Sequence, residues 1–323
     1  MAVKTAVIGL GIMGQRMVAQ MQANPGYQVV AGWDPSAQAC AQAQAAAPGL
    51  AIADSAEQAM ADAQLVYLAC PPVPRKHYAL QAAAAGRAVF LEKPLGVDVA
   101  ESRDLVARLA ASGVPAAVNF TQAASPALTR THKAAQQGQL GALAGVDIVV
   151  SYAQWPRLWQ QGADWLRFRA EGGMTREVIS HFLFVAQRIL GPLRAVQACP
   201  SYPTQPDLCE SHMLARLENA DGLPVSVFAS VGGAQPDRQE LVIKGQAESR
   251  RITDFYADWA STGAAFSPLE LPAGDPRSGA LQAQLGDLLL CLQGKPHRLA
   301  TPDEALHVQI LIETMLAGGA QPA

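Results

Sequence analysis

Two side chains in the second half of the sequence have types and a spacing that suit proton transfer. Glu177 and His181 lie four residues apart in a run from about Met174 to Leu190 that has helical periodicity, so they should share one face of that helix. The carboxylate could hydrogen-bond one imidazole nitrogen and leave the other for proton exchange with a substrate. A satisfied structural pair at a domain interface is the alternative interpretation.

A glycine-rich turn near the N-terminus indicates what such a pair could act beside. The apolar run from Ala2 to Ile8 leads into Gly9-x-Gly11-x-x-Gly14, and a helical pattern begins at once. Gly9 permits a tight turn, Gly11 lets the backbone approach a pyrophosphate, and Gly14 allows close packing of helix and strand. Free N–H groups at the helix start attract the phosphates. The turn therefore predicts a dinucleotide site.

An acidic residue at the end of the next apolar run supports this prediction. The run from Tyr27 to Trp33 ends in Asp34, twenty residues after Gly14. A carboxylate there accepts hydrogen bonds from both ribose hydroxyls of an adenosine and would repel the 2′-phosphate of NADP. Residues 35–38 offer no arginine to hold that phosphate, so NAD is favoured over NADP. A glycine-rich turn without a ligand is the alternative.

Lys93 is a third ionisable candidate, because it follows the apolar run from Ala88 to Leu91 and precedes Pro94. The proline restricts Lys93 to an extended conformation. Beside a positively charged nicotinamide ring, like charge and desolvation would lower the pKa of the lysine, and the amine could exchange a proton with a substrate hydroxyl. A solvated lysine in a turn is the alternative.

Composition narrows the class of partner. The 323 residues are enough for two domains, and 50% hydrophobic against 16% charged residues argues against disorder. A formal net charge of -3 gives no reason to expect nucleic acid or an anionic membrane surface. Apolar runs such as Leu288–Leu292 are too short to span a bilayer. The five cysteines lack disulfide or zinc-site spacing, and no secretory signal precedes the first strand. A cytoplasmic protein with a small-molecule partner and no metal is predicted.

The first 121 residues contain the elements that must position the dinucleotide. Short β-rich runs alternate there with Ala-rich helical runs, which is typical of a doubly wound parallel sheet with right-handed crossovers. Ligands bind beyond the carboxyl ends of such strands, where Gly9, Asp34, residues 70–72 and residues 92–94 all fall. The expected strands are Thr5–Ile8, Gln28–Trp33, Leu65–Ala69, Ala88–Leu91 and Ala116–Asn119.

Residues 122–323 follow a different pattern and are predicted to form an α+β domain. Strand-like runs follow one another there without helices between them, which indicates an antiparallel sheet. Two amphipathic helices, Ala280–Leu292 and Pro302–Ala317, end the chain. The expected strand-like runs are Ala195–Ala198, Ser211–Leu217, Val225–Val231, Glu240–Lys244 and Glu248–Thr253.

Taken in order, the motifs of the chain resemble those of the Gfo/Idh/MocA oxidoreductases. The resemblance covers nearly the whole chain and is weakest from about residue 235 onward. It implies a Rossmann domain, a second domain with one large, mostly antiparallel, open-faced sheet, and hydride transfer between NAD(P) and a sugar, polyol or related hydroxy or keto compound. The motifs are the glycine fingerprint, Leu65–Cys70 followed by Pro71-Pro72 and His77, Glu92-Lys93-Pro94, Asn119-Phe120, and Trp165-x-Arg167 before Gly172-Gly173 and His181.

The resemblance also implies roles for single residues. The family's active lysine falls on Lys93, its catalytic histidine on His181, and its acidic partner, frequently aspartate, on the longer Glu177. Trp165 and Arg167 become candidate substrate contacts. The family's Arg-rich stretch after the domain junction is replaced here by residues 121–125. The expected cofactor contacts are Gly9, Gly11, Ile12, Met13, Gly14, Asp34, Cys70, Pro71, His77, Glu92, Lys93 and Asn119.

Some of these assignments have structural alternatives. His77 could make only a local hydrogen bond at its helix start, and the tryptophans and arginines between residues 155 and 169 could pack between domains instead of contacting substrate. We expect a homodimer or homotetramer, because a large antiparallel sheet covered on one side leaves an apolar face that monomers rarely expose. A dinucleotide-binding regulator without turnover and an NAD-dependent glycosidase are the alternatives to a dehydrogenase.

Overall fold

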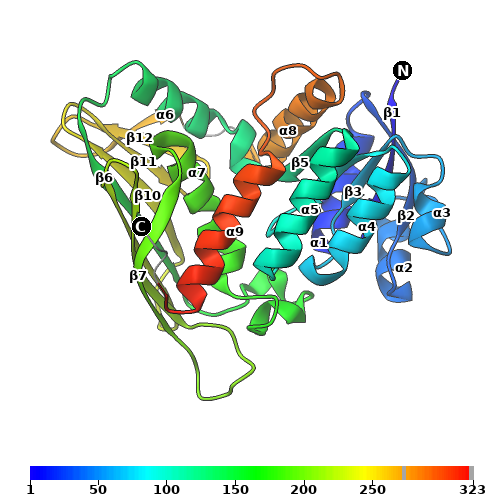
Figure 1. Cartoon of the computed structure of the whole chain (residues 1–323), viewed down its shortest axis with the longest axis horizontal. Coiled ribbons are helices and arrows are strands. Elements are labelled where there is room, and N and C mark those ends of the chain that lie inside the picture. The colour runs from blue at the N-terminus through cyan, green and yellow to red at the C-terminus, as the bar shows by residue number, and fades with distance from the viewer. Residues whose placement is uncertain (271–273, 320–323) are drawn as a thin grey trace. The chain divides into compact units, whose positions relative to one another are not determined.

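A five-stranded parallel sheet forms from the N-terminal part of the chain (Figure 1). The computed structural model describes residues 1–270 and 274–319. The strand order is β2-β1-β3-β4-β5, and β3 and β4 are buried along their whole length, as a parallel sheet covered on both faces requires. The predicted alternation of strands and helices is therefore confirmed. The strands are β1 (Val3–Ile8), β2 (Tyr27–Trp33), β3 (Leu65–Leu68), β4 (Ala88–Glu92) and β5 (Ala116–Asn119).

Side-chain caps fix where several of the connecting helices begin. Ser36, Ser55 and Asp98 each accept a hydrogen bond from the backbone N–H three residues later, which satisfies one of the free donors of the first turn. Gly113 ends α5 in the left-handed conformation, with φ 68°. The helices of this part are α1 (Ile12–Gln22), α2 (Ala37–Ala46), α3 (Ala56–Met60), α4 (Pro72–Ala84) and α5 (Val99–Ser112).

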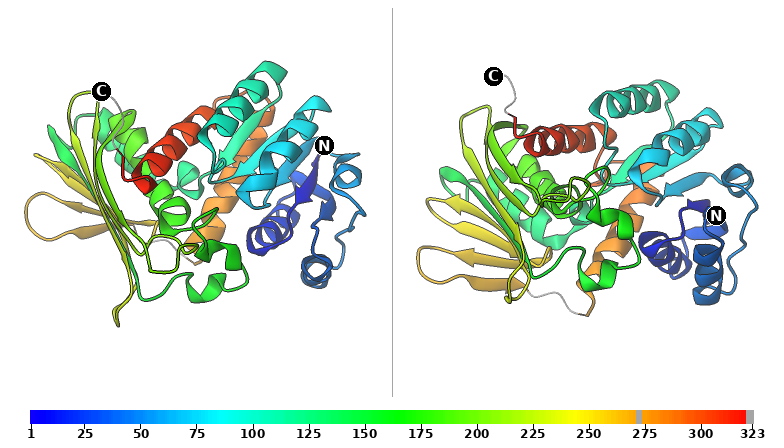
Figure 2. Two further views of the ribbon diagram at one scale, coloured as in Figure 1. Left: turned by 60° about the horizontal axis from the view of Figure 1, so that its bottom comes forward. Right: turned by 90° about the horizontal axis from the view of Figure 1, so that it is seen from below.

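An eight-stranded sheet with the order β13-β12-β11-β10-β6-β9-β8-β7 forms from the later strands. The β6–β9 pair is parallel and the other pairs are antiparallel, which confirms the predicted mostly antiparallel sheet. Figure 2 shows these strands as one curved layer with helices on one side. The strands are β6 (Leu143–Tyr152), β7 (Leu193–Ser201), β8 (His212–Asn219), β9 (Pro224–Val231), β10 (Arg238–Gly245), β11 (Ser249–Thr253), β12 (Ala257–Ser261) and β13 (Ser267–Glu270).

The strands of this sheet alternate between a buried and an accessible face. Along β9, Val225, Val227 and Ala229 are buried, whereas Phe228, which lies between Val227 and Ala229, is 47% exposed. In the same unit, α6 (Pro126–Gln136) follows the 3₁₀ turn Thr121–Ala124, and α7 (Ser180–Leu190) follows the π-helical turn Thr175–Ile179. One-sided burial gives the period-2 pattern that predicted these strands.

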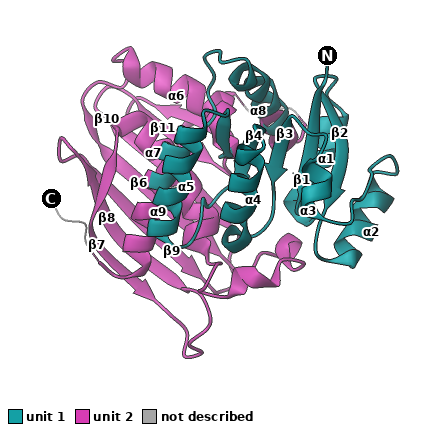
Figure 3. Ribbon diagram, turned by 45° about the vertical axis from the view of Figure 1, so that its right-hand side comes forward, with its two compact units in different colours: residues 1–120, 281–306 teal, residues 121–280, 307–323 magenta. Residues whose placement is uncertain are grey.

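The chain divides into two compact units (Figure 3). Unit 1 comprises residues 1–120 and 281–306, and unit 2 comprises the described residues of 121–280 and those from 307 onward. The predicted single boundary after residue 121 does not include the later segment, residues 281–306, that belongs to unit 1. These residues belong to unit 1 because leucines of α8 (Pro276–Leu292) pack in its core. The chain then passes into unit 2 within α9 (Pro302–Leu316). The leucines are Leu281, Leu285 and Leu288.

Candidate functional site

The glycine turn of unit 1 has the geometry that a dinucleotide-binding turn requires. Gly9 has φ 95°, and a Cβ placed on it would lie 2.5 Å from the backbone nitrogen of Cys70. A Cβ on Gly14 would lie 1.9 Å from the carbonyl oxygen of Gly9, so α1 approaches β1 only because this residue is glycine. A Cβ on Gly11 would meet no described atom within 4 Å. Gly11 therefore lies at a surface where a pyrophosphate could approach the backbone.

Asp34 is fixed by hydrogen bonds from both neighbouring loops. Its Oδ2 accepts the N–H of Leu10 at 2.7 Å, and its Oδ1 accepts the N–H of Ser36 at 2.8 Å. Each carboxylate oxygen has a further lone pair, so both could still accept ribose hydroxyls. The predicted position of the acid beside the glycine turn is thus what the structure shows.

Arg75, which sequence reasoning missed, ties together the loops after β3 and β4. This side chain of α4 is 2% exposed. Its Nη2 donates to the carbonyl oxygen of Cys70 at 2.6 Å, and its Nη1 donates to the carbonyl oxygen of Pro94. The arginine therefore fixes the turn that carries Lys93, next to the cis peptide bond between Lys93 and Pro94. Its two partners lie 5 and 19 residues away, and no local pattern marks it.

Glu92 and Asn119 use their side chains in a buried network inside unit 1. Glu92 accepts hydrogen bonds from the Tyr67 hydroxyl and from Nδ2 of Asn119, the latter at 2.6 Å. Oδ1 of Asn119 in turn accepts from Nε2 of Gln284 at 2.9 Å. Burial raises the pKa of Glu92, while the Tyr67 hydrogen bond and the charge of Lys93 act in the opposite direction. These contacts support the loop ends, and the predicted cofactor contact of both residues stays a prediction.

The other predicted cofactor contacts of unit 1 differ in burial. Cys70 is buried, and Pro71 is exposed at the start of α4. Burial also raises the pKa of the Cys70 thiol. His77 is exposed, and its ring lies edge-on to Tyr78 at a centroid distance of 5.3 Å. Lys93 is partly buried.

Glu177 lies in a π-helical turn rather than in the regular helix that its spacing predicted. The turn spans Thr175–Ile179 and continues directly into α7, which carries His181. A π-helical turn is wider than an α-helical one and is found frequently at functional sites. Oε1 of Glu177 accepts a hydrogen bond from Nε2 of Gln160 at 2.9 Å and lies 3.8 Å from Nη2 of Arg157. The acid is therefore fixed by the segment that follows β6.

Arg157 is enclosed by aromatic rings. Its Cζ lies 5.3 Å from the ring centroid of Tyr152, 5.8 Å from that of Trp155 and 4.7 Å from that of Trp159, and its Nε donates to Gln160 Oε1 at 2.7 Å. Cation–π contact of this kind stabilises a buried guanidinium. Trp155 and Trp159 therefore contact Arg157 within unit 2, and packing between domains, the structural alternative for these residues, stays a prediction.

Trp165 and Arg167, the candidate substrate contacts, lie in a short 3₁₀ turn, Asp164–Arg167. Arg167 is exposed, pairs with Asp164 at 3.3 Å and lies over the ring of Phe168. Trp165 is partly buried. Their contact with substrate stays a prediction.

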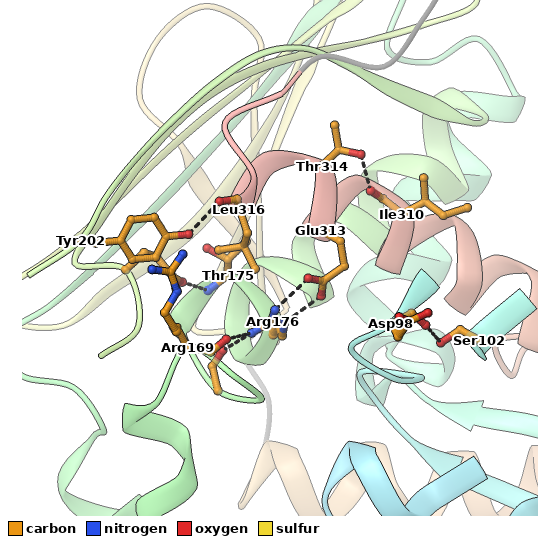
Figure 4. A network of polar contacts seen from close by, with 12 residues as sticks. Asp98, Ser102, Arg169, Thr175, Arg176, Tyr202, Ile310, Glu313, Thr314 and Leu316 are labelled. Atoms are coloured by element: carbon orange, nitrogen blue, oxygen red, sulfur yellow. Dashed lines mark hydrogen bonds and ion pairs between the residues drawn. The ribbon is translucent and has the colours of Figure 1, made fainter. Parts of the chain in front are cut away.

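Arg176 anchors the π-helical turn (Figure 4). Its Nε and Nη2 each donate to Glu313 of α9 at 2.7 Å, and its Nη1 donates to the carbonyl oxygens of Arg169 and Gly172 at 2.7 and 3.0 Å. A cavity of about 220 Å³ lies beside this pair. It is lined by Arg169, Arg176, Tyr202, Glu210, Glu313, Leu316 and Ala317.

Glu210 supports the same turn from the loop before β8. It is 2% exposed and accepts the backbone N–H of Thr175 at 2.7 Å. Burial raises the pKa of its carboxyl group. A Cβ on Gly173 would lie 2.5 Å from Oε2 of Glu210, so glycine is required where this carboxylate approaches the chain. These contacts fix the turn that presents Glu177 and leads to His181.

The described residues contain no cluster of histidine, cysteine or carboxylate side chains that could hold a metal ion. None of the helices in the described ranges is long and apolar enough to cross a membrane.

Comparison with known proteins gives a family match and structural neighbours. Residues 3–120 match the family described as an oxidoreductase family with an NAD-binding Rossmann fold. No curated protein sequence matches the chain.

Three solved structures show the same fold. The WlbA dehydrogenase from Bordetella pertussis, in complex with NADH and UDP-GlcNAcA, has a TM-score of 0.83 at 19% identity, with 100% of each chain covered. GenD2 from gentamicin A biosynthesis, in complex with NAD, has a TM-score of 0.82 at 22% identity, covering 100% of this chain and 97% of that one. A putative myo-inositol dehydrogenase from Sinorhizobium meliloti 1021 has a TM-score of 0.80 at 18% identity, covering 98% and 97%.

The resemblance drawn from the motifs is thereby confirmed for residues 3–120, and beyond them the solved structures share the fold. Residues 3–120 thus match the Gfo/Idh/MocA family, described as an oxidoreductase family with an NAD-binding Rossmann fold.

Proposed function

We propose that this oxidoreductase is a dehydrogenase or reductase that transfers a hydride between NAD and a CH–OH group of a sugar, polyol or related hydroxy or keto compound. The observation that carries the proposal is the nucleotide half of the site. Gly9 and Gly14 pack closely in a turn whose backbone is accessible at Gly11. Asp34 accepts a hydrogen bond from this turn, and Lys93 follows β4. The similar structures of a putative inositol dehydrogenase and of a dehydrogenase with a bound UDP-sugar support the substrate class.

The side chains that would move protons are Lys93 and His181. In the oxidation direction, the two groups bind the reacting hydroxyl and one of them removes its proton. NAD, when bound, supplies the hydride acceptor. Glu177 orients His181, and its own position is set by Arg157 and Gln160. Because Arg157 is held by three aromatic rings, the carboxylate has a fixed cationic neighbour.

NAD is the preferred cofactor in this proposal. A carboxylate at the position of Asp34 would repel a 2′-phosphate, and this like charge would disfavour NADP. Its hydrogen bonds to Leu10 and Ser36 keep it from turning away.

We also propose a homo-oligomer that associates through the accessible face of the eight-stranded sheet. Four residues lie in one cross-strand row on that face, and the pairing of neighbouring strands places them side by side. Leu214 and Phe228 within the row are 54% and 47% exposed. A contiguous exposed apolar row of this kind is typical of protein interfaces. The row is Cys199, Leu214, Phe228 and Val149.

A substrate panel tests the reaction class directly. Polyols, free sugars and sugar nucleotides would each be incubated with the protein and NAD, and NADH would be followed by its absorbance. We expect net NADH formation with members of one of these groups. Sugar release from glycosides without net NADH would support the NAD-dependent glycosidase instead, and NAD binding without turnover of any compound would support the regulator. A cytoplasmic location stays a prediction from the sequence.

A further inference from the structure

The hairpin between β11 and β12 has an unusual backbone at its turn. Asp254 and Phe255 adopt φ values of 51° and 67°, and in the described ranges these two are the only residues other than glycine with a positive φ. Left-handed backbone is sterically costly for a residue with a Cβ, and for a bulky aromatic residue it is an outlier. Backbone strain of this kind persists only where the surrounding structure over-determines it, and it clusters at functional sites.

The residue types at this turn depart from the common solution. Hairpin turns with successive left-handed residues favour Asn-Gly or Asp-Gly, because glycine accepts this backbone without cost. Asp254 fits that preference, but Phe255 occupies a position where glycine would be cheaper.

Hydrogen bonds hold the turn in its strained form. The N–H of Asp254 donates to the carbonyl oxygen of Gln239 at 3.0 Å, and the N–H of Tyr256 donates to that of Thr253 at 3.1 Å. Nε1 of Trp259 donates to the Thr253 hydroxyl at 3.0 Å.

The phenyl ring of Phe255 contacts the imidazole ring of His181 on α7. Its centroid lies 5.6 Å from that of the His181 imidazole, with an interplanar angle of 79°, which is an edge-to-face arrangement. The same ring stacks on Phe182 at 5.2 Å and 14°. Phe255 and His181 are each 8% exposed, so the two rings confine one another.

We propose that Phe255 is a positioning residue that fixes the orientation of the His181 imidazole. The second side-chain torsion of histidine has broad minima, so packing decides which way the ring nitrogens point. Proton transfer requires a donor and an acceptor within hydrogen-bond reach and correctly oriented. In this proposal the strained backbone persists at position 255 because glycine, which would relieve the strain, has no ring to contact His181. The inference rests on the proposed role of His181 in proton transfer.

Phe255→Gly is the decisive variant, because it removes the ring and relieves the left-handed backbone at once. A purely structural ring would lower activity only through lost stability. A positioning ring would lower kcat by about ten- to hundredfold, with KM changed by less than about threefold, in a protein that remains folded at the assay temperature. Phe255→Tyr keeps the ring and should restore kcat to within about threefold.

Two control variants separate the ring from the turn and from aromatic packing in general. Asp254→Gly relaxes the backbone and keeps the Phe255 ring. Phe266→Leu removes another aromatic ring of unit 2, one that lies over Arg251 at 4.6 Å. Both should keep kcat within about twofold of the native protein.

A spectroscopic measurement on the free protein distinguishes failure of this inference from failure of the proposed function. With histidine labelled at Cε1, the chain gives signals from six histidines, and His181→Gln assigns one of them. Phe255→Gly should shift or broaden the His181 signal, whereas Phe266→Leu should not. An unchanged His181 signal together with unchanged kcat overturns the positioning role. A shifted signal in a protein whose His181→Gln variant keeps full activity retains the contact but refutes the proton-transfer role on which the inference rests.

Discussion

At the scale of single residues, the proposed preference for NAD over NADP depends on Asp34. Its carboxylate is fixed by the N–H groups of Leu10 and Ser36 and is available to ribose hydroxyls. We predict that the native protein binds NAD more tightly than NADP and that Asp34→Ser narrows the difference, because serine neither repels a phosphate nor accepts two hydroxyls as well. Titration of each cofactor against tryptophan fluorescence measures both affinities.

The control for this prediction is Asp54→Ser, which removes an exposed carboxylate of the same unit. It should leave the preference unchanged. Equal or tighter binding of NADP by the native protein would refute the prediction.

The site residues that the sequence predicted and those that it missed differ in how far along the chain their contact partners lie. Gly9, Gly14 and Asp34 belong to one local strand-turn-helix-strand pattern, and their geometry agrees with that pattern. Arg75 and Phe255 have no such signal, since their importance comes from contacts with Pro94 and His181 that only the folded chain creates.

At the scale of elements, the π-helical turn depends on an ion pair with α9. Arg176 and Glu313 are 137 residues apart, and their side chains are 9% and 18% exposed. Glu313→Gln leaves the guanidinium without its charged partner in a largely buried place. We predict a loss of about 2 kcal/mol in the free energy of unfolding, below the larger costs seen for fully buried pairs because Glu313 keeps some contact with water.

Asp164→Asn is the matched control, since it breaks the exposed pair of Arg167 and Asp164. Such a pair contributes about 0.5 kcal/mol or less. Urea unfolding of both variants gives the comparison, and a loss in Glu313→Gln no larger than in the control would show that the anchor contributes little.

Sequence patterns predicted the two sheets and missed the finer elements. Alternating runs gave the parallel strands, and period-2 burial gave strands such as Val225–Val231 in the larger sheet. The run from Met174 to Leu190 kept a helical pattern throughout, because a single wider turn shifts the periodicity by only one residue. The sequence did not predict that Leu281, Leu285 and Leu288 pack in the core of unit 1, because the spacing of apolar residues does not specify which core a helix joins.

At the scale of the whole molecule, we predict an oligomer that dissociates when its apolar row is charged. Phe228→Asp places a carboxylate in the centre of the row formed with Leu214 and Val149. The native protein should show a dimer or tetramer mass by light scattering at micromolar concentration, and the variant should show a smaller one, because burying an unpaired charge in an interface is costly.

Val73→Asp is the control for this experiment, since Val73 is an exposed apolar residue of α4, 61% accessible, outside the sheet. The Val73→Asp variant should have the same mass by light scattering as the native protein. A native monomer mass would contradict the prediction at once.

The proposed function assigns proton transfer to Lys93 and His181. The most direct test is the kinetics of Lys93→Met, His181→Ala and their double variant on the substrate that the panel identifies, with NAD affinity measured in parallel. Each single change should lower kcat by about two to four powers of ten and leave NAD affinity within about threefold, and Glu177→Gln should be milder. The double variant should be little slower than the slower single one, because groups that act as a unit are not additive. Full activity in both single variants would contradict the account and move the regulator interpretation ahead.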